Sequence, residues 1–104
     1  MNFATEPSRD DIDALAEPTL VEFGAAHCGH CRAAQPLIAE ALAGHPAVNH
    51  IKIEDGPGRR LGRSFRVKLW PTLVFLRQGQ EAARLVRPAD SAMIEQALAQ
   101  IDVA

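Results

Sequence analysis

Apolar residues follow two different spacings along this chain, and these spacings predict alternating helices and strands. In four segments the apolar side chains recur every three or four positions, as on the buried face of a helix. These segments are residues 8–17, 29–43, 59–65 and 90–101. In four others the apolar residues run together or alternate, as they do in strands. These segments are residues 19–25, 47–53, 71–76 and 82–86.

The order of these elements predicts the fold class. A strand, a helix and a second strand come first, and a short helix, a hairpin with a tight turn at residues 78–80 and a closing helix follow. This order is typical of an α/β protein whose central mixed sheet, of four to five strands, is flanked by about four helices. Because the chain has 104 residues, we expect a single domain over residues 1–104.

Composition argues against several classes of protein. The chain is 47% hydrophobic and 23% charged, with a formal net charge of −2, which favours neither disorder nor general attraction to nucleic acid. No apolar run approaches the roughly 20 residues that span a bilayer, so we expect no membrane protein. The first residues are acidic and polar rather than basic and then apolar, so we expect a cytoplasmic protein. Nothing in the pattern demands a dimer, and we expect a monomer.

Candidate chemistry is concentrated at the only two cysteines, Cys28 and Cys31. Cys28 falls where the first strand ends and the long helix begins. The unpaired N–H groups and the dipole of the helix would stabilise a thiolate there, so we expect a lowered pKa for Cys28. Cys31 lies about one helical turn further on, within reach of a disulfide. A Cys-x-x-Cys pair in this position is typical of a redox site.

The Cys28-Gly29-His30-Cys31 motif, the residues that lead into it, Pro36 and Trp70-Pro71-Thr72 together resemble the thioredoxin family, and the resemblance covers nearly the whole chain. Residues 20–23, which lead into Cys-Gly-His-Cys, are similar to the active-site stretch of that family. Pro36 is similar to the proline that kinks the helix after the cysteines, and Trp70-Pro71-Thr72 resembles the loop that holds a cis-proline. The inner Gly-His dipeptide and Glu22 are closer to protein disulfide isomerase domains than to ordinary thioredoxins, which usually carry Gly-Pro.

The resemblance implies a thiol-disulfide oxidoreductase that acts on protein substrates and holds no cofactor beyond its own disulfide. Cys28 would be the nucleophile, and Cys31 would resolve the mixed disulfide. Glu22 would be buried under the site with a pKa raised by desolvation, and would shuttle the proton of Cys31. Pro71, if cis, would bring the backbone of Trp70 against the substrate as an added strand. A thioredoxin reductase or a small thiol would donate the electrons.

Two histidines are expected to tune this chemistry. His30 lies between the cysteines, where a positive charge favours the thiolate and makes the couple more oxidising. We therefore expect a reduction potential less negative than the roughly −270 mV of thioredoxin. His50 begins the second strand, near where many thioredoxins place a lysine close to the buried acid. Our hypothesis is that His50 and Glu22 titrate as a coupled pair.

Departures from the family pattern converge on the expected substrate-binding surface. His27 stands where thioredoxins usually have tryptophan, and Arg87 stands where they commonly have a glycine beside the substrate groove. Trp70 is an unusually large neighbour for the proline. We expect these three residues to contact the substrate, together with Gly29, which allows close approach of another chain. They affect the choice of partner more than the chemistry of the cysteines.

Other interpretations of the cysteine motif are open from the sequence. His27, Cys28, His30 and Cys31 are four potential zinc ligands, but zinc sites usually draw on two separated pairs, and we expect no metal site. In a second alternative, the two cysteines are inert, buried residues. In a third, the chain is a redox-inactive binding or assembly-chaperone module with a thioredoxin-like fold.

A basic cluster lies in and after the third predicted helix. Its members are Arg59, Arg60, Arg63, Arg66 and Lys68. Such a run is most often a solvated helix face, and the alternative is a docking patch for an acidic partner protein. Nucleic-acid binding is disfavoured because no aromatic residues are interleaved with the basic ones.

Overall fold

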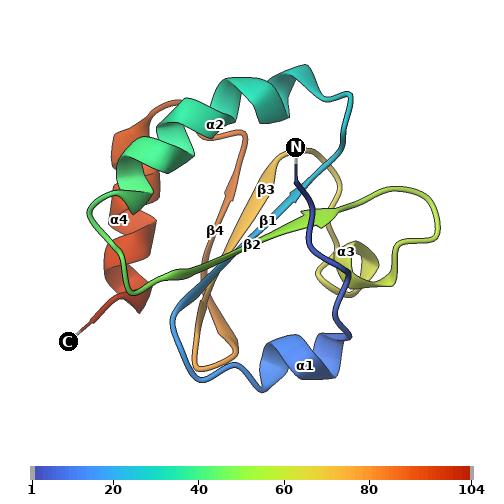
Figure 1. Cartoon of the computed structure of the whole chain (residues 1–104), viewed down its shortest axis with the longest axis horizontal. Helices are drawn as coiled ribbons and strands as arrows, with labels where there is room; N and C mark the ends of the chain where they lie inside the picture. The colour runs from blue at the N-terminus through green and yellow to red at the C-terminus, as the bar shows by residue number, and fades with distance from the viewer. Residues whose placement is uncertain (1, 104) are drawn as a thin grey trace.

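The computed structural model of the chain describes residues 2–103 and has the predicted order of elements (Figure 1). Met1 and Ala104, the ends of the predicted domain, lie outside the described residues. The helices are α1 (Arg9–Asp13), α2 (Gly29–Leu42), α3 (Arg60–Ser64) and α4 (Ser91–Ile101). The strands are β1 (Thr19–Gly24), β2 (Asn49–Glu54), β3 (Thr72–Arg77) and β4 (Gln80–Val86). Among the described residues, none of the helices combines the length and the apolar character needed to cross a membrane.

The strands form one mixed sheet in the order β2-β1-β3-β4. β1 runs parallel to β2 and antiparallel to β3, and β4 runs antiparallel to β3. The predicted mixed sheet flanked by four helices is confirmed, with four strands within residues 2–103. The N-terminal segment contributes a hydrogen bond from the N–H of Ala4 to the carbonyl of Lys52 (2.8 Å), but it forms no fifth strand in this part of the chain.

Element boundaries differ from the predicted ones by a few residues. At the second strand, β2 begins at Asn49 and not at position 47. The N–H of Val48 donates to the carbonyl of His45 (3.1 Å), and this turn keeps the chain out of the sheet until Asn49. At the hairpin, Gln78 and Gly79 both have positive φ angles (51° and 77°). A two-residue turn of this kind matches the twist of the strands, so β4 begins at Gln80, earlier than predicted.

β1 lies in the middle of the sheet and separates two apolar cores. All six of its residues are buried, and strand alternation places Leu20 and Glu22 on one face and Val21 and Phe23 on the other. α2 and α4 cover the first face, where Leu20 packs against residues of both helices (Figure 1). Residues of α1 and α3 pack against Val21 and Phe23 on the second face. Glu22 is therefore a carboxylate that lies under α2.

Three segments of the chain meet at the same end of the strands. Phe23 near the end of β1 pairs with Thr72 at the start of β3, and Thr72 pairs with Val86 at the end of β4. The turn from β1 into α2, the loop before β3 and the residues after β4 therefore emerge together. These segments carry most of the residues that the sequence singles out.

Candidate active site

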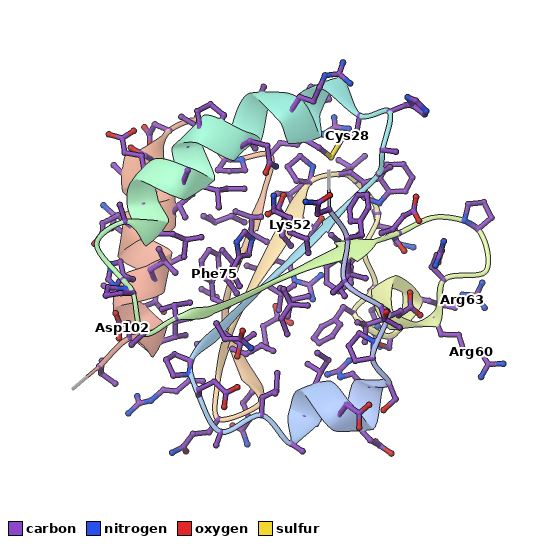
Figure 2. The ribbon with its side chains drawn as sticks, in the orientation of Figure 1. Cys28, Lys52, Arg60, Arg63, Phe75 and Asp102 are labelled. Carbon is purple, nitrogen blue, oxygen red and sulfur yellow. A yellow bond between two sulfur atoms is a disulfide. The ribbon has the colours of Figure 1, made fainter. Side chains whose placement is uncertain are left out.

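Cys28 and Cys31 form a disulfide at the amino end of α2 (Figure 2). Cys28 caps the helix, and its Sγ accepts a hydrogen bond from the backbone N–H of Cys31 (3.1 Å). Cys31 is fully buried, whereas Cys28 keeps 9% of its surface exposed. Cys28 is therefore the more accessible of the two cysteines, and the first turn of the helix directs an N–H at its sulfur.

The sulfur of Cys31 packs against the end of β1. A Cβ atom at Gly24 would come within 3.0 Å of the Cys31 Sγ, so the missing side chain at this position makes room for the sulfur. Glu22 lies two residues before Gly24, on the same face of the strand. The buried sulfur and the buried carboxylate therefore occupy successive positions under α2.

Both carboxylate oxygens of Glu22 have hydrogen-bonding partners. Oε1 lies 2.8 Å from the Nε2 of His50, and Oε2 accepts from the Nε2 of Gln35 (2.7 Å). The Gln35 Nε2 also donates to the carbonyl of Cys31 (3.0 Å), and the Gln35 Oε1 accepts from the Nζ of Lys52 (2.8 Å). A chain of hydrogen bonds thus joins the buried acid to the backbone of Cys31 and to two basic side chains of β2.

The expected raised pKa of Glu22 is wrong for this disulfide-bonded state. Burial raises the pKa and is the largest single influence, but hydrogen bonds from His50 and Gln35 and the charges of His50 and Lys52 oppose it. Together they lower the pKa of Glu22 below its ordinary value of 4.5. The sequence argument placed His50 near Glu22 but based the direction of the shift on burial alone, and it did not include Gln35 or Lys52. His50 does lie beside Glu22 as supposed, while their coupled titration stays a prediction.

The peptide bond between Trp70 and Pro71 is cis, and neighbouring residues hold this loop. The N–H of Arg87 donates to the Pro71 carbonyl (3.1 Å), and the Nε of Arg87 donates to the Trp70 carbonyl (2.9 Å). The indole Nε1 of Trp70 donates to the Oδ2 of Asp55 (2.9 Å), in the segment between β2 and α3. The fold therefore brings Trp70, Pro71 and Arg87 together and adds Asp55 to them.

His27, Gly29 and His30 are exposed around the amino end of α2. A Cβ atom at Gly29 would have only the Nη2 of Arg32 within 4 Å, at 3.9 Å, so the space in front of the helix is open. His30 and Arg87 line one shallow hollow of about 330 Å³. Their expected roles in tuning and substrate binding stay predictions.

The basic cluster is divided in the structure. Arg59 pairs with Glu54 (2.9 Å), whereas Arg60 and Arg63 project from α3 away from the body of the protein (Figure 2). Arg60, Arg63, Arg66 and Lys68 are exposed, and within residues 2–103 none of them has a carboxylate oxygen within 4.0 Å. Within the described part of the chain, four cations without acidic partners therefore lie on α3 and in the segment that follows it.

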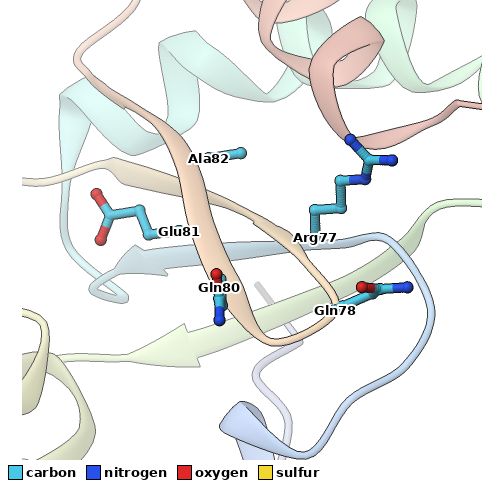
Figure 3. A pocket seen from close by; sticks show the side chains of 5 residues that line it. All are labelled: Arg77, Gln78, Gln80, Glu81 and Ala82. Carbon is cyan, nitrogen blue, oxygen red and sulfur yellow. The ribbon is translucent and has the colours of Figure 1, made fainter.

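Another hollow lies on the β3–β4 hairpin (Figure 3). It is lined by Arg77, Gln78, Gln80, Glu81 and Ala82. None of the predicted site residues belongs to it, and it contains no nucleophilic side chain, so we assign it no role. Across the described residues, no three His, Cys, Asp or Glu side chains are grouped so that they could hold a metal ion.

Gly24, Gln35 and Asp55 belong to the site but were not predicted from the sequence. The spacing offers a signal for Gln35, which lies four residues after Cys31 and therefore on the same face of α2. Asp55 has only the appearance of a turn residue before Gly56 and Pro57 in the sequence. Its contact with Trp70 joins two segments that no local pattern relates.

Comparisons with known proteins agree with this geometry. The family model for thioredoxin matches residues 3–100. The structure of reduced thioredoxin 2 from Pseudomonas aeruginosa PAO1 is 58% identical, covers 97% of this chain and 94% of its own, and superposes with a TM-score of 0.86. Thioredoxin C-3 of Corynebacterium nephridii is 32% identical over 84 residues, which are 81% of this chain and 54% of that protein. Protein disulfide-isomerase of Gallus gallus is 38% identical over 68 residues, which are 62% of this chain and 13% of that protein. The chain spans about half the length of several curated relatives that it matches.

Proposed function

Because this chain belongs to the thioredoxin family, we propose that it is an oxidoreductase that exchanges disulfides with protein substrates through Cys28 and Cys31. The observation that carries the proposal is the position of the Cys28 sulfur. Cys28 is the more exposed of the two cysteines, and its sulfur accepts an N–H from the first turn of α2. In the reduced protein, this N–H and the helix dipole stabilise the thiolate, which is the nucleophilic form.

The reaction transfers two electrons in two steps. The Cys28 thiolate attacks one sulfur of the substrate disulfide, forms a mixed disulfide and releases the other substrate sulfur as a thiolate. Cys31 then loses its proton and attacks the sulfur of Cys28, which closes the disulfide and releases the second substrate thiolate. The substrate gains the two electrons that the cysteine pair loses. A thioredoxin reductase or a small thiol returns them, in a reducing compartment such as the cytoplasm.

We propose that Glu22 accepts the proton that Cys31 loses. The link through Gln35 and the shared face of β1 support this assignment. The lowered pKa of Glu22 in the disulfide form means that the carboxylate is ionised once the reaction is complete. His50, whose side chain is 22% exposed, then provides a route for the proton between Glu22 and solvent.

In this proposal, the substrate chain lies across the end of the strands where the cis-proline loop meets the amino end of α2. The cis bond before Pro71 and the open space in front of Gly29 support this path. His27, before α2, and Arg87, beside the cis-proline loop, are both exposed along this path. The backbone of Trp70 would pair with the substrate as with an added strand.

The proposed couple is more oxidising than that of an ordinary thioredoxin, because the exposed His30 lies between the two cysteines in the sequence. Equilibration with glutathione should give a potential less negative than about −270 mV. The change of His30→Pro should make the potential more negative. A wild-type value more negative than that of thioredoxin would contradict this part of the proposal.

Reduction of insulin with dithiothreitol as electron source tests the reaction itself. The wild-type protein should accelerate it, and Cys28→Ser should abolish the acceleration. Arg77→Gln, an exposed change on the far hairpin, is the control and should leave the rate unchanged. Equal turnover by Cys28→Ser would defeat the proposal and favour a redox-inactive binding module. The variant Cys31→Ser keeps the attacking sulfur, so it should accumulate mixed disulfides from which the protein substrates are identified.

A further inference from the structure

Arg87 is exposed, yet its backbone and its side chain are both hydrogen-bonded to the cis-proline loop. It follows directly on β4 with a φ of 51°, in the left-handed region that favours glycine. Its N–H donates to the Pro71 carbonyl (3.1 Å), and its Nε donates to the Trp70 carbonyl (2.9 Å). Two hydrogen bonds to successive carbonyls thus fix Arg87 against the cis-proline loop.

The outer end of the Arg87 guanidinium has no partner in the described chain. Its Nη1 and Nη2 atoms, which carry four N–H groups, donate to no acceptor within residues 2–103, where only the Nε is engaged. No carboxylate of this part of the chain lies within 4.0 Å. Asp90, the acid closest in sequence, instead accepts from the N–H of Met93 at the start of α4. The exposed end of Arg87 is therefore a planar fork available to a carboxylate from outside.

The hollow beside Arg87 suits an acidic group. It lies between α2 and the segment that leads from β4 to α4, and its only polar lining residues are Arg87 and His30. The others are alanines, a leucine and a proline, and no acidic side chain lines it. Because His30 belongs to the first turn of α2, the hollow reaches the amino end of the helix that carries the two cysteines. A substrate chain with its sulfur at Cys28 would bring its neighbouring residues to this place.

We propose that Arg87 is a specificity-determining residue that binds an Asp or Glu side chain within a few residues of the substrate's cysteine. This inference rests on the proposed disulfide exchange and adds the chemical class of the substrate segment. The bond from the Nε to Trp70 orders the guanidinium before the substrate arrives, so less conformational entropy is lost on binding. The Trp70 oxygen has a second lone pair and still accepts a backbone N–H from the substrate.

Two disulfide-bridged peptides test the proposal. They are identical except that the residues flanking one cysteine are Glu in the first and Gln in the second. For the wild-type protein, kcat/KM should be about three- to fivefold higher for the Glu peptide, which is the upper range for an exposed ion pair. The preference should shrink as salt is raised.

Variants at position 87 assign the preference to this side chain. Arg87→Gln should bring the ratio of the two kcat/KM values close to one, and Arg87→Lys should keep part of it, because lysine retains the charge without the fork. Arg87→Gly relieves the positive φ, so it folds readily and should also lose the preference. Arg77→Gln removes the same charge at the far end of β3 and should keep the wild-type ratio.

The outcomes separate the inference from the reaction on which it rests. If the wild-type protein reduces both peptides equally well, Arg87 is not selective. A preference that survives Arg87→Gln, or that Arg77→Gln also abolishes, overturns the role of Arg87 as well. In these cases the exchange reaction stands. If the wild-type protein reduces neither peptide with dithiothreitol present, the proposed function itself is contradicted, and the inference with it.

Discussion

The Nε2 of His50 lies 2.8 Å from the Oε1 of Glu22 and joins a partly exposed imidazole to a buried carboxylate. The side chain of Glu22 is only 2% exposed, while that of His50 is 22% exposed. An ionised carboxylate without donors would be costly at such a position. Through this histidine, β2 supplies both a partner for the buried charge and a path from that charge to solvent.

Removal of this partner should raise the pKa of Glu22. In His50→Leu, burial still raises the pKa, while the hydrogen bond and the charge of His50 no longer lower it. Because the wild-type pKa is lowered, the stability from this pair is present above 4.5 and lost as the pH falls through the lowered value. Acid unfolding of His50→Leu should therefore begin at higher pH. NMR titration of the Glu22 carboxyl carbon measures the change, with the exposed His27→Leu as control. An unchanged titration in His50→Leu would show that His50 has no influence on Glu22.

The two glycines next to the cysteines should respond differently to alanine. Gly24→Ala should lower the free energy of unfolding by about 1–3 kcal/mol, the usual cost of overpacking, because its Cβ would lie 3.0 Å from the Cys31 Sγ. Gly29→Ala is the matched control, since its Cβ would have only the Nη2 of Arg32 within 4 Å, and it should change stability by less than about 0.5 kcal/mol. Urea unfolding of the oxidised proteins measures both. Equal effects would mean that the sulfur of Cys31 moves aside freely.

His45 links the end of α2 to α4 through both ring nitrogens. Its Nε2 lies 2.6 Å from the Oε1 of Glu95, and its Nδ1 lies 2.6 Å from the Oδ2 of Asp102. The hydrogen bonds with Glu95 and Asp102, and then their charges, raise the pKa of His45 above its ordinary 6.5, although burial lowers it. The stability from this contact is therefore fully present below pH 6.5 and lost as the pH rises through the raised value.

Thermal unfolding at a series of pH values tests the effect of His45. His45→Gln should be less stable than the wild type in mildly acidic buffer, and the difference should narrow as the pH rises above 6.5. His27→Gln changes an exposed histidine and should follow the wild-type curve. If the wild type and His45→Gln differ by the same amount at every pH, the titration of His45 does not contribute to stability.

The contact between Trp70 and Asp55 should be visible in fluorescence, because Trp70 is the only tryptophan. Asp55→Ala leaves the half-buried indole N–H without its acceptor and should cost about 1–3 kcal/mol of stability, with a shift of the emission. Asp55→Asn keeps an acceptor oxygen, so it should retain most of the stability and an emission close to that of the wild type. Gly62→Ala should reproduce the spectral shift, because its Cβ would collide with the Asp55 carboxylate. Identical emission from Asp55→Ala and the wild type would show that the indole does not depend on this bond.

Local patterns were sufficient for the elements and for the position of the cysteines. The sequence indicates β1 as a strand because its apolar run is short and only Glu22 interrupts it, and α2 as a helix because its apolar residues keep helical spacing as far as Leu42. The junction between them places Cys28 at a helix start, and a separation of three residues is enough to bring Cys31 within disulfide reach. These features depend on neighbours in the chain, whose distances are set by backbone geometry.

The electrostatics of the site depended on contacts between distant segments. Burial of Glu22 follows from its apolar neighbours, but the direction of its pKa shift depends on donors from α2 and β2, up to 28 positions away. The bonds from Arg87 to Trp70 and from Trp70 to Asp55 likewise join residues 17 and 15 positions apart. A pattern of apolar and polar residues indicates whether a side chain is buried. Which donors and acceptors then surround it is set by the packing of helices on the sheet and by the register of the strands, and these arise only when the whole chain folds.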